Sequence, residues 1–478
     1  MRPRINVLKI SVGVMVLPNR KLLGAMNDFL WSLTLCLLFL IYSLPLFVRV
    51  YATTQMVIDE EFHLKQGLHF CNKRFDVWDN KITTFPGLYL FSLILYPFNF
   101  CSVLGLRLIS LVAAAVNVVL FYMIRRAQLE KFRIGNNTMA ALEAFTIAAL
   151  PPLYFFSHLY YTDTLSLTMV LVFYLYWQKG DHLQAAVFAA ASVLLRQTNV
   201  IWVGMACACT ALDIIVSDYA CFKKIPRRTV NILQAKLWLE LFKNFKLFFK
   251  CVWDVLKQCS FYIIIILPFV GFVFLNKSIV LGDKRAHVAA LHVPQLFYFA
   301  AFTCIFAITN TSQKIEIALR TILHRKFSFV CLLIISLIII KYNTLVHPYL
   351  LADNRHYTFY IWQRFYGRYI WFKYAMCPIY VICLTIIHQS IEHLNRNFTI
   401  MFYIAVFLSL CFQRLLEVRY FLIPFVLFRL HIKPNIRSRI PQWLELSIYV
   451  AINALTFYIF FTKEIRWKDY KEPQRIIW

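Results

Sequence analysis

The sequence predicts an all-α polytopic membrane protein, and two observations carry that prediction. The first is composition: 60% of the 478 residues are hydrophobic, only 15% are charged, and the mean hydropathy is +0.63. A soluble domain carries about 25% charged residues. The second is the recurrence of apolar runs of about 20 residues, the length that a helix needs to cross a bilayer. We therefore expect one integral membrane domain over 1–478 rather than two or three soluble domains.

The apolar runs predict about 12 to 14 transmembrane helices, each identified by its length and composition. They lie near 28–50, 105–124, 139–157, 164–178, 183–196, 199–216, 260–280, 290–309, 327–341, 368–388, 399–413, 417–432 and 444–462. The first helix is expected to be an uncleaved anchor, because the stretch before it has only a short apolar patch and no cleavable signal peptide.

One further apolar run, 86–104, is long enough to cross, but the basic residues argue against it. If the N-terminus is cytosolic and 86–104 does not cross, four basic loops are all cytosolic, as the positive-inside rule requires. These loops are 125–133, 223–257, 314–326 and 431–439. We therefore expect 51–104 to be a lumenal loop, with 86–104 lying in or dipping into the lumenal interface.

Basic residues outnumber acidic ones by 50 to 23, which gives a net charge of +27. On a soluble protein this excess would suggest nucleic acid. Here the basic residues gather between apolar segments, so we expect anionic membrane lipids as partners and no nucleic acid. In the loop 217–259, charged residues recur at three- and four-residue steps over 231–257, with apolar residues between them. An interfacial helix on the cytosolic leaflet explains this pattern, and calmodulin binding is the alternative.

Cysteine and glycine usage exclude two kinds of site. The 13 cysteines lie mostly inside apolar segments and form no CxxC pair, so buried thiols are expected rather than a zinc site. Glycine is scarce, with 11 residues, and neither a GxGxxG nor a GxxxxGKS/T loop occurs. A nucleotide-bound donor is therefore not expected.

Three carboxylates and a histidine follow the first apolar run: Asp59, Glu60, Glu61 and His63. Charge is costly inside a bilayer, so this cluster should lie at the membrane–water boundary. A carboxylate there could serve as a general base, because neighbouring carboxylates raise one another's pKa. A solvated helix cap explains the cluster as well, and a metal site at Asp59 and His63 has no evident third ligand.

Two shorter motifs carry polar chemistry. Trp78 and Asp79 could contact a sugar ring by stacking and hydrogen bonding, although the segment after them also suits a simple turn that opens a helix. Arg196 and Gln197 interrupt two apolar runs, and a cation at that depth usually pairs with an anion such as a phosphate. A helix end capped by Thr198 is the alternative.

The richest polar and aromatic block lies in the predicted lumenal loop 342–367. Its functional groups are those of Asp353, Arg355, His356, Tyr360, Trp362 and Arg364. Arg355 and His356 could hold a phosphate, while Tyr360 and Trp362 could line the path of a sugar or an isoprenoid. An ordered interfacial loop with an aromatic belt is the alternative.

These motifs resemble those of the dolichyl-phosphate-glucose-dependent α-1,2-glucosyltransferases of the endoplasmic reticulum, which add the third, terminal glucose to the lipid-linked oligosaccharide. The resemblance covers most of the chain and keeps its order. It rests on Asp59-Glu60-x-Phe62-His63, Trp78-Asp79-x-Lys81-Ile82-Thr83-Thr84-x-Pro86-Gly87-Leu88-Tyr89, Arg196-Gln197-Thr198-Asn199, Leu281-Gly282-Asp283, His287, His292-x-Pro294-Gln295-Leu296, His347-Pro348 to Arg364, Arg419-Tyr420-Phe421 and Gln474-Arg475 to Trp478. Two positions depart from it: Glu61 stands where an apolar residue is expected, and Phe85 where proline is expected.

The resemblance implies a GT-C-type bundle in the endoplasmic reticulum membrane with its active site facing the lumen. It implies inverting transfer of glucose from dolichyl β-D-glucosyl phosphate to the diglucosylated dolichyl-diphosphate-linked oligosaccharide, with Asp59 as the base and Glu60 orienting the acceptor or tuning the base. Arg196, Arg355 and His356 would stabilise the leaving phosphate. No metal or other cofactor is expected, because a lipid phosphate leaving group does not need one. The expected substrate contacts are Glu61, His63, Trp78, Asp79, Arg196, Gln197, Asp283, His287, His292, Asp353, Arg355, His356, Tyr360, Trp362 and Arg364.

A polytopic transporter or a channel-regulating membrane protein is the alternative from another class. Charges inside apolar segments, such as Glu143, Asp213 and Lys373, are compatible with it. An inverted repeat with broken helices would favour transport, and the sequence shows none.

Overall fold

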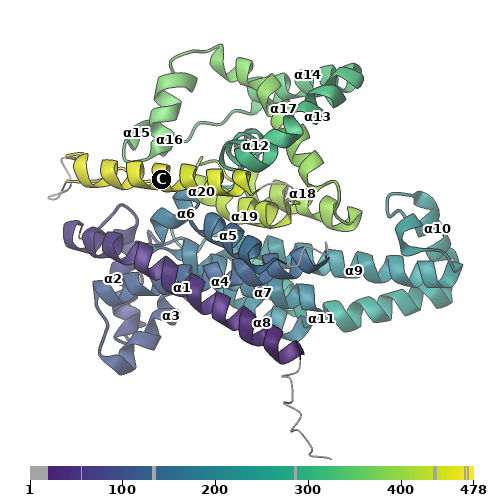
Figure 1. Cartoon of the computed structure of the whole chain (residues 1–478), viewed down its shortest axis with the longest axis horizontal. Coiled ribbons are helices and arrows are strands. Elements are labelled where there is room, and N and C mark those ends of the chain that lie inside the picture. Colours follow the sequence, from purple (N-terminus) through teal and green to yellow (C-terminus); the bar gives the residue numbers. More distant parts are fainter. Residues whose placement is uncertain are drawn as a thin grey trace, which may run out of the picture.

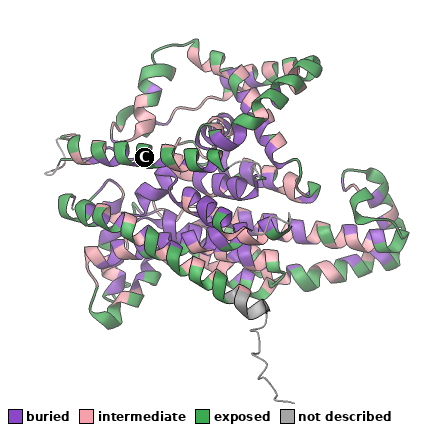
Figure 2. Cartoon of the chain, in the orientation of Figure 1, coloured by how far each residue is buried: buried purple, intermediate pink, exposed green. Residues whose placement is uncertain are grey.

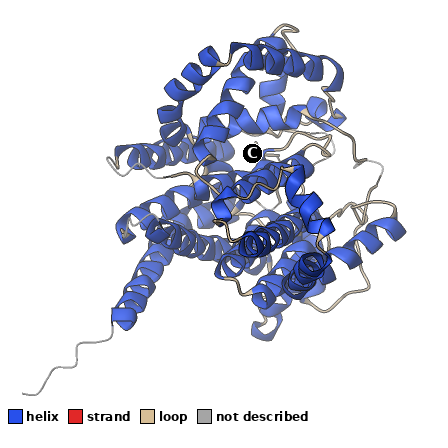
Figure 3. Ribbon diagram, turned by 90° about the vertical axis from the view of Figure 1, so that its right-hand side faces the viewer, coloured by secondary structure: helices blue, strands red, loops and turns tan. Residues whose placement is uncertain are grey.

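The computed structural model describes residues 20–54, 56–131, 136–284, 288–433, 439–467, 470 and 473–478. Over these residues the chain is built from helices and contains no β-strand, only two isolated β-bridges (Figure 3). The prediction of an all-α protein is confirmed.

The first half of the chain forms a layer of long helices that run side by side (Figure 1). Between them lie short helices at the two ends of the layer. The bounds are α1 Arg20–Thr53, α2 Glu60–Cys71, α3 Gly87–Phe91, η1 Ser92–Phe98, α4 Val103–Lys131, α5 Asn137–Ala148, α6 Pro151–Phe156, α7 Thr162–Lys179, α8 His182–Leu195, η2 Gln197–Asn199, α9 Val200–Lys223, η3 Arg227–Thr229, α10 Ala235–Lys243 and α11 Phe245–Asn276.

The second half packs its helices over this layer and returns to it at the C-terminus, with α20 lying along α5 and α6. Its bounds are α12 Pro294–Phe306, α13 Ile308–His324, α14 Lys326–Asn343, α15 Pro348–Ala352, α16 Tyr357–Ile361, η4 Trp362–Tyr366, α17 Phe372–Ile391, α18 Arg396–Leu410, η5 Val418–Phe421, α19 Leu422–His431 and α20 Ile440–Thr462. The element η4 is a single π-helical turn.

Among the described residues, seven helices are long and apolar enough to cross a membrane on their own. Four shorter apolar helical stretches accompany them, and every one of the predicted transmembrane segments overlaps a helix. In α11 and α14 only 11% of the apolar window is buried inside the protein. Their outward faces are therefore apolar, as lipid contact requires, while the buried residues gather between the layers (Figure 2).

The run 86–104 is not one helix: α3 and η1 are short, and the chain reverses at Asn99, whose φ is 51°. A disulfide joins Cys71 at the end of α2 to Cys101 before α4, with their Cα atoms 5.7 Å apart. The chain between these residues therefore starts and ends at the same level and makes no single crossing. The disulfide corrects the expectation that the cysteines are buried thiols, which holds for others such as Cys209 and Cys377.

Two basic segments differ from their predictions. The expected interfacial helix over 231–257 is divided at Asn244, whose side chain accepts a hydrogen bond 3.0 Å long from the Leu247 N–H and caps α11. The helix α11 then continues without a break into its apolar half. The segment 314–326, taken as a loop, belongs instead to the amphipathic helix α13 and the start of α14.

The two ends of the helix layer differ in chemistry. In α7, Asp163 lies in the first turn and Lys179 at the end. At a rise of 1.5 Å per residue, the 16 steps between them span about 24 Å. The end that carries Asp163 also holds α2, α3, α15 and α16, whereas α10 lies at the opposite end (Figure 1).

Candidate active site

A cluster of five charged side chains lies at the end of the bundle that carries Asp163. Its centre is Arg419 in η5, whose Nη2 lies 3.0 Å from Asp59 Oδ2 and 2.7 Å from Glu417 Oε2. Nη1 of the same guanidinium lies 3.9 Å from Asp163 Oδ2. Asp163 also forms an ion pair with Nη1 of Arg196, which lies at the end of α8. We call these five residues the acid–arginine cluster.

The acid–arginine cluster joins four parts of the chain that lie far apart in the sequence. Asp59 begins α2, Asp163 begins α7, Arg196 ends α8 and Arg419 precedes α19. With three carboxylates and two guanidiniums, the cluster carries one net negative charge. Although burial works against it, the three neighbouring carboxylates raise the pKa of Arg419 above its usual value.

Asp59 is the carboxylate of the cluster that a ligand can reach. Protein surrounds it on most sides, yet 45% of its side-chain surface is exposed, against 1% for Asp163 and 15% for Glu417. Burial alone would raise the pKa of Asp59, but the Arg419 guanidinium above all holds that pKa below its usual value. Asp59 is therefore ionised at neutral pH and available to accept a proton.

The backbone before Asp59 is strained. Ile58 has a φ of 50°, in the left-handed region, and a β-branched side chain there costs about 1–3 kcal/mol. Such outliers cluster at sites where the surrounding structure imposes a conformation. Here the turn starts α2 and directs Asp59 toward Arg419.

Glu60 was predicted as a second catalytic carboxylate, and its placement argues otherwise. Its side chain has no exposed surface and forms a bidentate ion pair with Arg107, with Nε–Oε1 and Nη2–Oε2 distances of 2.8 and 2.7 Å. Oε1 also accepts a hydrogen bond from the Tyr160 N–H, 2.8 Å long. The Arg107 Nη1 in turn donates to the Thr54 carbonyl oxygen. Glu60 therefore anchors α2 to α4 and faces no open space in which it could orient an acceptor.

Glu61 and His63 lie on either side of the same helix. Glu61 pairs with the exposed Lys65 over 2.6 Å. His63 is buried, and its Nδ1 lies 2.7 Å from the Tyr89 hydroxyl. Burial lowers the pKa of His63 to about 4, so its ring is neutral at neutral pH. His63 can orient the site through hydrogen bonds but does not act as a cation there.

Trp78 and Asp79 lie in the loop between α2 and α3, where the Asp79 N–H donates to Gln66 Oε1 of α2. Trp78 packs edge-on against Phe70 and Tyr89, with ring centroids 6.2 and 5.9 Å apart, and remains partly exposed. Asp79 Oδ1 accepts a hydrogen bond from the Lys81 N–H at 2.9 Å, which closes the turn before α3. The partly exposed Trp78 side chain can contact a sugar, whereas the Asp79 carboxylate stabilises the turn.

The loop between α14 and α17 is tied to the C-terminal segment. Arg355 forms a bidentate pair with Asp353 at 2.9 and 2.8 Å, and its Nη1 donates to Gln474 Oε1. The guanidinium also stacks over Trp467, 4.1 Å from the ring centroid. These contacts occupy a buried Arg355, so its predicted role in holding a phosphate is not supported by this placement.

His356 has the more open position of the two. Its Nε2 lies 3.9 Å from Asp353 Oδ2, and it is close enough to Asp59 to lower the pKa of that carboxyl. A parallel β-bridge pairs His356 with Ile477. The C-terminal segment thus holds the loop 353–357 over the acid–arginine cluster.

The three remaining predicted residues of this loop lie on α16 and η4. The Arg364 guanidinium lies over the Tyr360 ring, 5.9 Å from its centroid, and both side chains keep exposed surface. Trp362 is buried and stacks on Tyr366, with centroids 5.1 Å apart. Tyr360 and Arg364 can therefore contact a ligand, while Trp362 supports the loop from within.

Four predicted substrate contacts remain: Gln197, Asp283, His287 and His292. Gln197 Nε2 donates to the Thr83 carbonyl oxygen at 2.8 Å, which ties η2 to the loop before α3. The segment that precedes the exposed Asp283 packs on the same loop, since Leu281 N–H donates to Thr83 O. His292 is buried, and that burial lowers its pKa to about 4. His287 lies outside the described residues.

Sequence reasoning did not assign Asp163, Glu417 or Arg419 to the site. Asp163 stood in a polar break between apolar runs and Arg419 in one of the matched motifs, but no spacing links either residue to Asp59, which is 360 positions from Arg419. Elsewhere in the described part of the chain, no three His, Cys, Asp or Glu side chains meet in a way that would hold a metal ion. The absence of a cofactor requirement stays a prediction.

The chain matches the sequence model of the DIE2/ALG10 family over residues 53–430. It is 54% identical, over 94% of its length and 99% of the relative, to a Drosophila melanogaster protein named Dol-P-Glc:Glc(2)Man(9)GlcNAc(2)-PP-Dol alpha-1,2-glucosyltransferase. Proteins of the same name from Homo sapiens and Mus musculus are 33% and 32% identical over 95% of this chain and 100% of their own lengths. No solved structure matches the chain. The match over most of its length shows that this protein belongs to the DIE2/ALG10 family.

Proposed function

We propose that this protein transfers glucose from dolichyl β-D-glucosyl phosphate to the diglucosylated dolichyl-diphosphate-linked oligosaccharide and forms the terminal α-1,2 linkage. Relatives that carry this activity in their names align with the chain from end to end. The single structural observation behind the proposal is the exposed Asp59 carboxylate, which Arg419 keeps ionised. The alternative of a transporter or channel regulator has no support among these relatives.

The proposed reaction is one inverting displacement. Asp59 accepts the proton of the acceptor glucose 2-hydroxyl as that oxygen attacks the anomeric carbon of the donor. The bond between the anomeric carbon and the phosphate oxygen breaks, and dolichyl phosphate leaves with the electron pair. Attack from the face opposite the leaving group turns the β-linked donor into an α-linked product, and no cofactor takes part.

The basic side chains around Asp59 would divide into two kinds. Arg419 and Arg196 are paired with carboxylates and act by positioning Asp59 and Asp163. His356, on the loop 353–357 over the cluster, and Arg364, which follows on η4, are the groups proposed to meet the leaving phosphate. Arg364 is exposed and forms no ion pair within the described residues. Cations placed where charge develops stabilise such a displacement.

We also propose that the acid–arginine cluster faces the lumen of the endoplasmic reticulum. The disulfide between Cys71 and Cys101 closes the loop that follows Asp59, and disulfides persist in oxidising compartments such as this lumen. Basic residues at the end of α4 and on α10 lie at the opposite end of the bundle, which the positive-inside rule assigns to the cytosol.

The test uses cells that lack the endogenous enzyme and express either the wild type, Asp59→Asn or the matched control Glu61→Gln. Glu61 lies two residues from Asp59, and within the described residues its ion pair is with the exposed Lys65. We expect the lipid-linked oligosaccharide with two glucoses to accumulate with Asp59→Asn and the three-glucose form to be restored by Glu61→Gln. Full restoration by Asp59→Asn protein would remove Asp59 from the role of base.

A further inference from the structure

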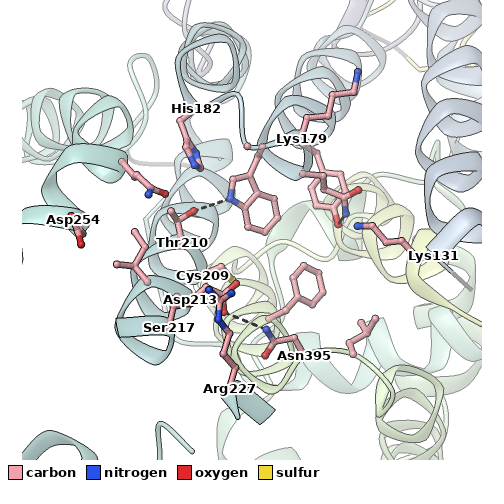
Figure 4. Close-up of a pocket in the computed structure, with 18 of the residues that line it drawn as sticks. Lys131, Lys179, His182, Cys209, Thr210, Asp213, Ser217, Arg227, Asp254 and Asn395 are labelled. Carbon is pink, nitrogen blue, oxygen red and sulfur yellow. Dashed lines mark hydrogen bonds between the residues drawn. The ribbon is translucent and has the colours of Figure 1, made fainter. Parts of the chain in front are cut away.

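A second polar site lies at the end of the bundle opposite Asp59. It is a cavity of about 1040 Å³ among the ends of α4, α7, α8, α9, α11, α18 and α19 (Figure 4). Lys179 and Asp163 lie at opposite ends of α7, about 24 Å apart along the helix axis. The cavity, which we call the basic cavity, is therefore separate from the acid–arginine cluster, and the proposed reaction makes no use of it.

Four cations line the basic cavity: Lys131, Lys179, Arg227 and Lys257. Within the described ranges, none of the four has a carboxylate oxygen within 4.0 Å. They come from three helices and a connecting 3-10 turn, so no short-range sequence pattern brings them together. Figure 4 shows Lys131 reaching into the cavity from one side and Arg227 from below.

The acidic residues of the same cavity are already engaged by other side chains. Asp213 Oδ1 accepts a hydrogen bond from Asn397 Nδ2 at 2.8 Å. Asp218 pairs with Lys250 over 2.5 Å, and the Asp254 carboxylate lies 4.0 Å from the same lysine. The neutral Asn397 leaves the charge of Asp213 in place, and the single Lys250 balances only one of Asp218 and Asp254. The lining therefore holds four cations against three carboxylates, with Lys250 as a further cation beside it, and the surplus charge is positive.

The inner wall of the basic cavity is rigid and partly flat. Trp177 stacks on Phe398, with centroids 6.4 Å apart, and its Nε1 donates to the Thr210 hydroxyl at 2.9 Å. Next to it, the Tyr174 hydroxyl lies 2.7 Å from His431 Nε2. The Trp177 N–H and the Tyr174 hydroxyl are already hydrogen-bonded within the protein. The lining cations are therefore the groups most available to bind a ligand.

We propose that the basic cavity binds a phosphate monoester, presented either on a lipid headgroup or on a soluble molecule. Lysine and arginine are the side chains that bind phosphate through charge-assisted hydrogen bonds, and a dianionic monoester balances several of them at once. Lys131 ends α4, which is long and apolar enough to cross a membrane, and Lys179 ends α7 beside it. The end of a spanning helix is where it reaches the headgroup layer. A phosphorylated headgroup in that leaflet is therefore within reach of the cavity, as is a phosphate in solution.

The test measures binding to the purified full-length protein with two probes. One is phosphatidic acid, a lipid monoester, included as a minor component of phosphatidylcholine nanodiscs, with phosphatidylserine nanodiscs as the comparison. The other is soluble glycerol 3-phosphate, which carries the same group without the acyl chains. The cavity variant is the triple substitution Lys179→Gln, Arg227→Gln and Lys257→Gln. The control triple is Lys236→Gln, Lys243→Gln and Lys246→Gln, which removes the same charge from exposed positions on α10 and α11 at the same end.

We expect the cavity triple to weaken phosphatidic acid or glycerol 3-phosphate binding by at least about tenfold, because three charge-assisted contacts are lost. The control triple should change binding by less than about twofold, since exposed charges contribute little. Binding of the lipid alone identifies a headgroup site, and binding of both probes identifies a site for the phosphate group itself. Equal losses in the two triples, equal binding of phosphatidylserine, or no binding of either probe to the wild type would overturn the proposal. Glucosyl transfer retained by the cavity triple shows that it is folded.

Discussion

Replacing Glu60 separates a structural carboxylate from a catalytic one. In Glu60→Gln, Arg107 would keep its charge in a position without exposed surface and lose the carboxylate that binds it through two nitrogen atoms. Breaking a buried ion pair in this way costs about 3–5 kcal/mol. The matched Glu61→Gln variant loses only an exposed pair, worth about 0–1 kcal/mol. We therefore expect a large loss of stability for the first variant and almost none for the second.

The assay combines thermal unfolding in detergent with transfer activity per folded molecule. A double variant, Glu60→Leu with Arg107→Leu, removes both charges together, and apolar replacement of a buried pair is often neutral or stabilising. We expect it to regain most of the stability and of the glucosyl transfer. A double variant that is stable but inactive would show that Glu60 takes part in the reaction. A Glu60→Gln protein as stable as Glu61→Gln would refute the structural role.

Three further predictions follow from the same contacts. Arg419→Gln removes the main group that lowers the pKa of Asp59, so that pKa should rise and the acid limb of the kcat/KM profile should move to higher pH. Arg419→Lys should move the limb part of the way back. An acid limb at the wild-type pH in Arg419→Gln would contradict the positioning role. The double variant Cys71→Ser, Cys101→Ser should lower the free energy of unfolding by about 2–4 kcal/mol, and a reductant should not lower it further. If the reductant destabilises the variant as much as the wild type, the disulfide is not the source of the reductant sensitivity. Trp478→Ala removes the ring contact with Tyr357 and should loosen the loop 353–357, so the KM for the donor should rise by a larger factor than kcat falls. An unchanged KM would show that the C-terminal segment does not position the loop.

The fold could be predicted as far as local composition determines it. Every predicted transmembrane segment overlaps a helix because apolar length alone identifies such segments. The break between α5 and α6 was missed, although Pro151 and Pro152 mark it, because the apolar run continues through them. The division at Asn244 was missed for the same reason: a capping side chain interrupts the helix without interrupting its amphipathic pattern.

Site residues could be predicted only where their neighbours in the sequence make them unusual. Asp59 was singled out because charge is costly inside a bilayer, which places the carboxylates after the first apolar helix at the membrane boundary, and because the family resemblance points to the same residue. Its role as the base stays a prediction. Its partner Arg419 could not be paired with it, since tertiary contact over 360 positions leaves no spacing to read. Glu60 was predicted to assist the base and Arg355 to hold a phosphate, but each pairs with a protein side chain that the sequence alone does not identify.

The most direct test of the account is the rate of glucosyl transfer by purified Asp59→Asn protein, with donor and acceptor saturating and folding checked against the wild type. Asparagine keeps the shape of the side chain but cannot accept the proton of the attacking hydroxyl. The account predicts a loss of at least about 100-fold, the low end of what a general base contributes. Transfer at the wild-type rate would contradict it.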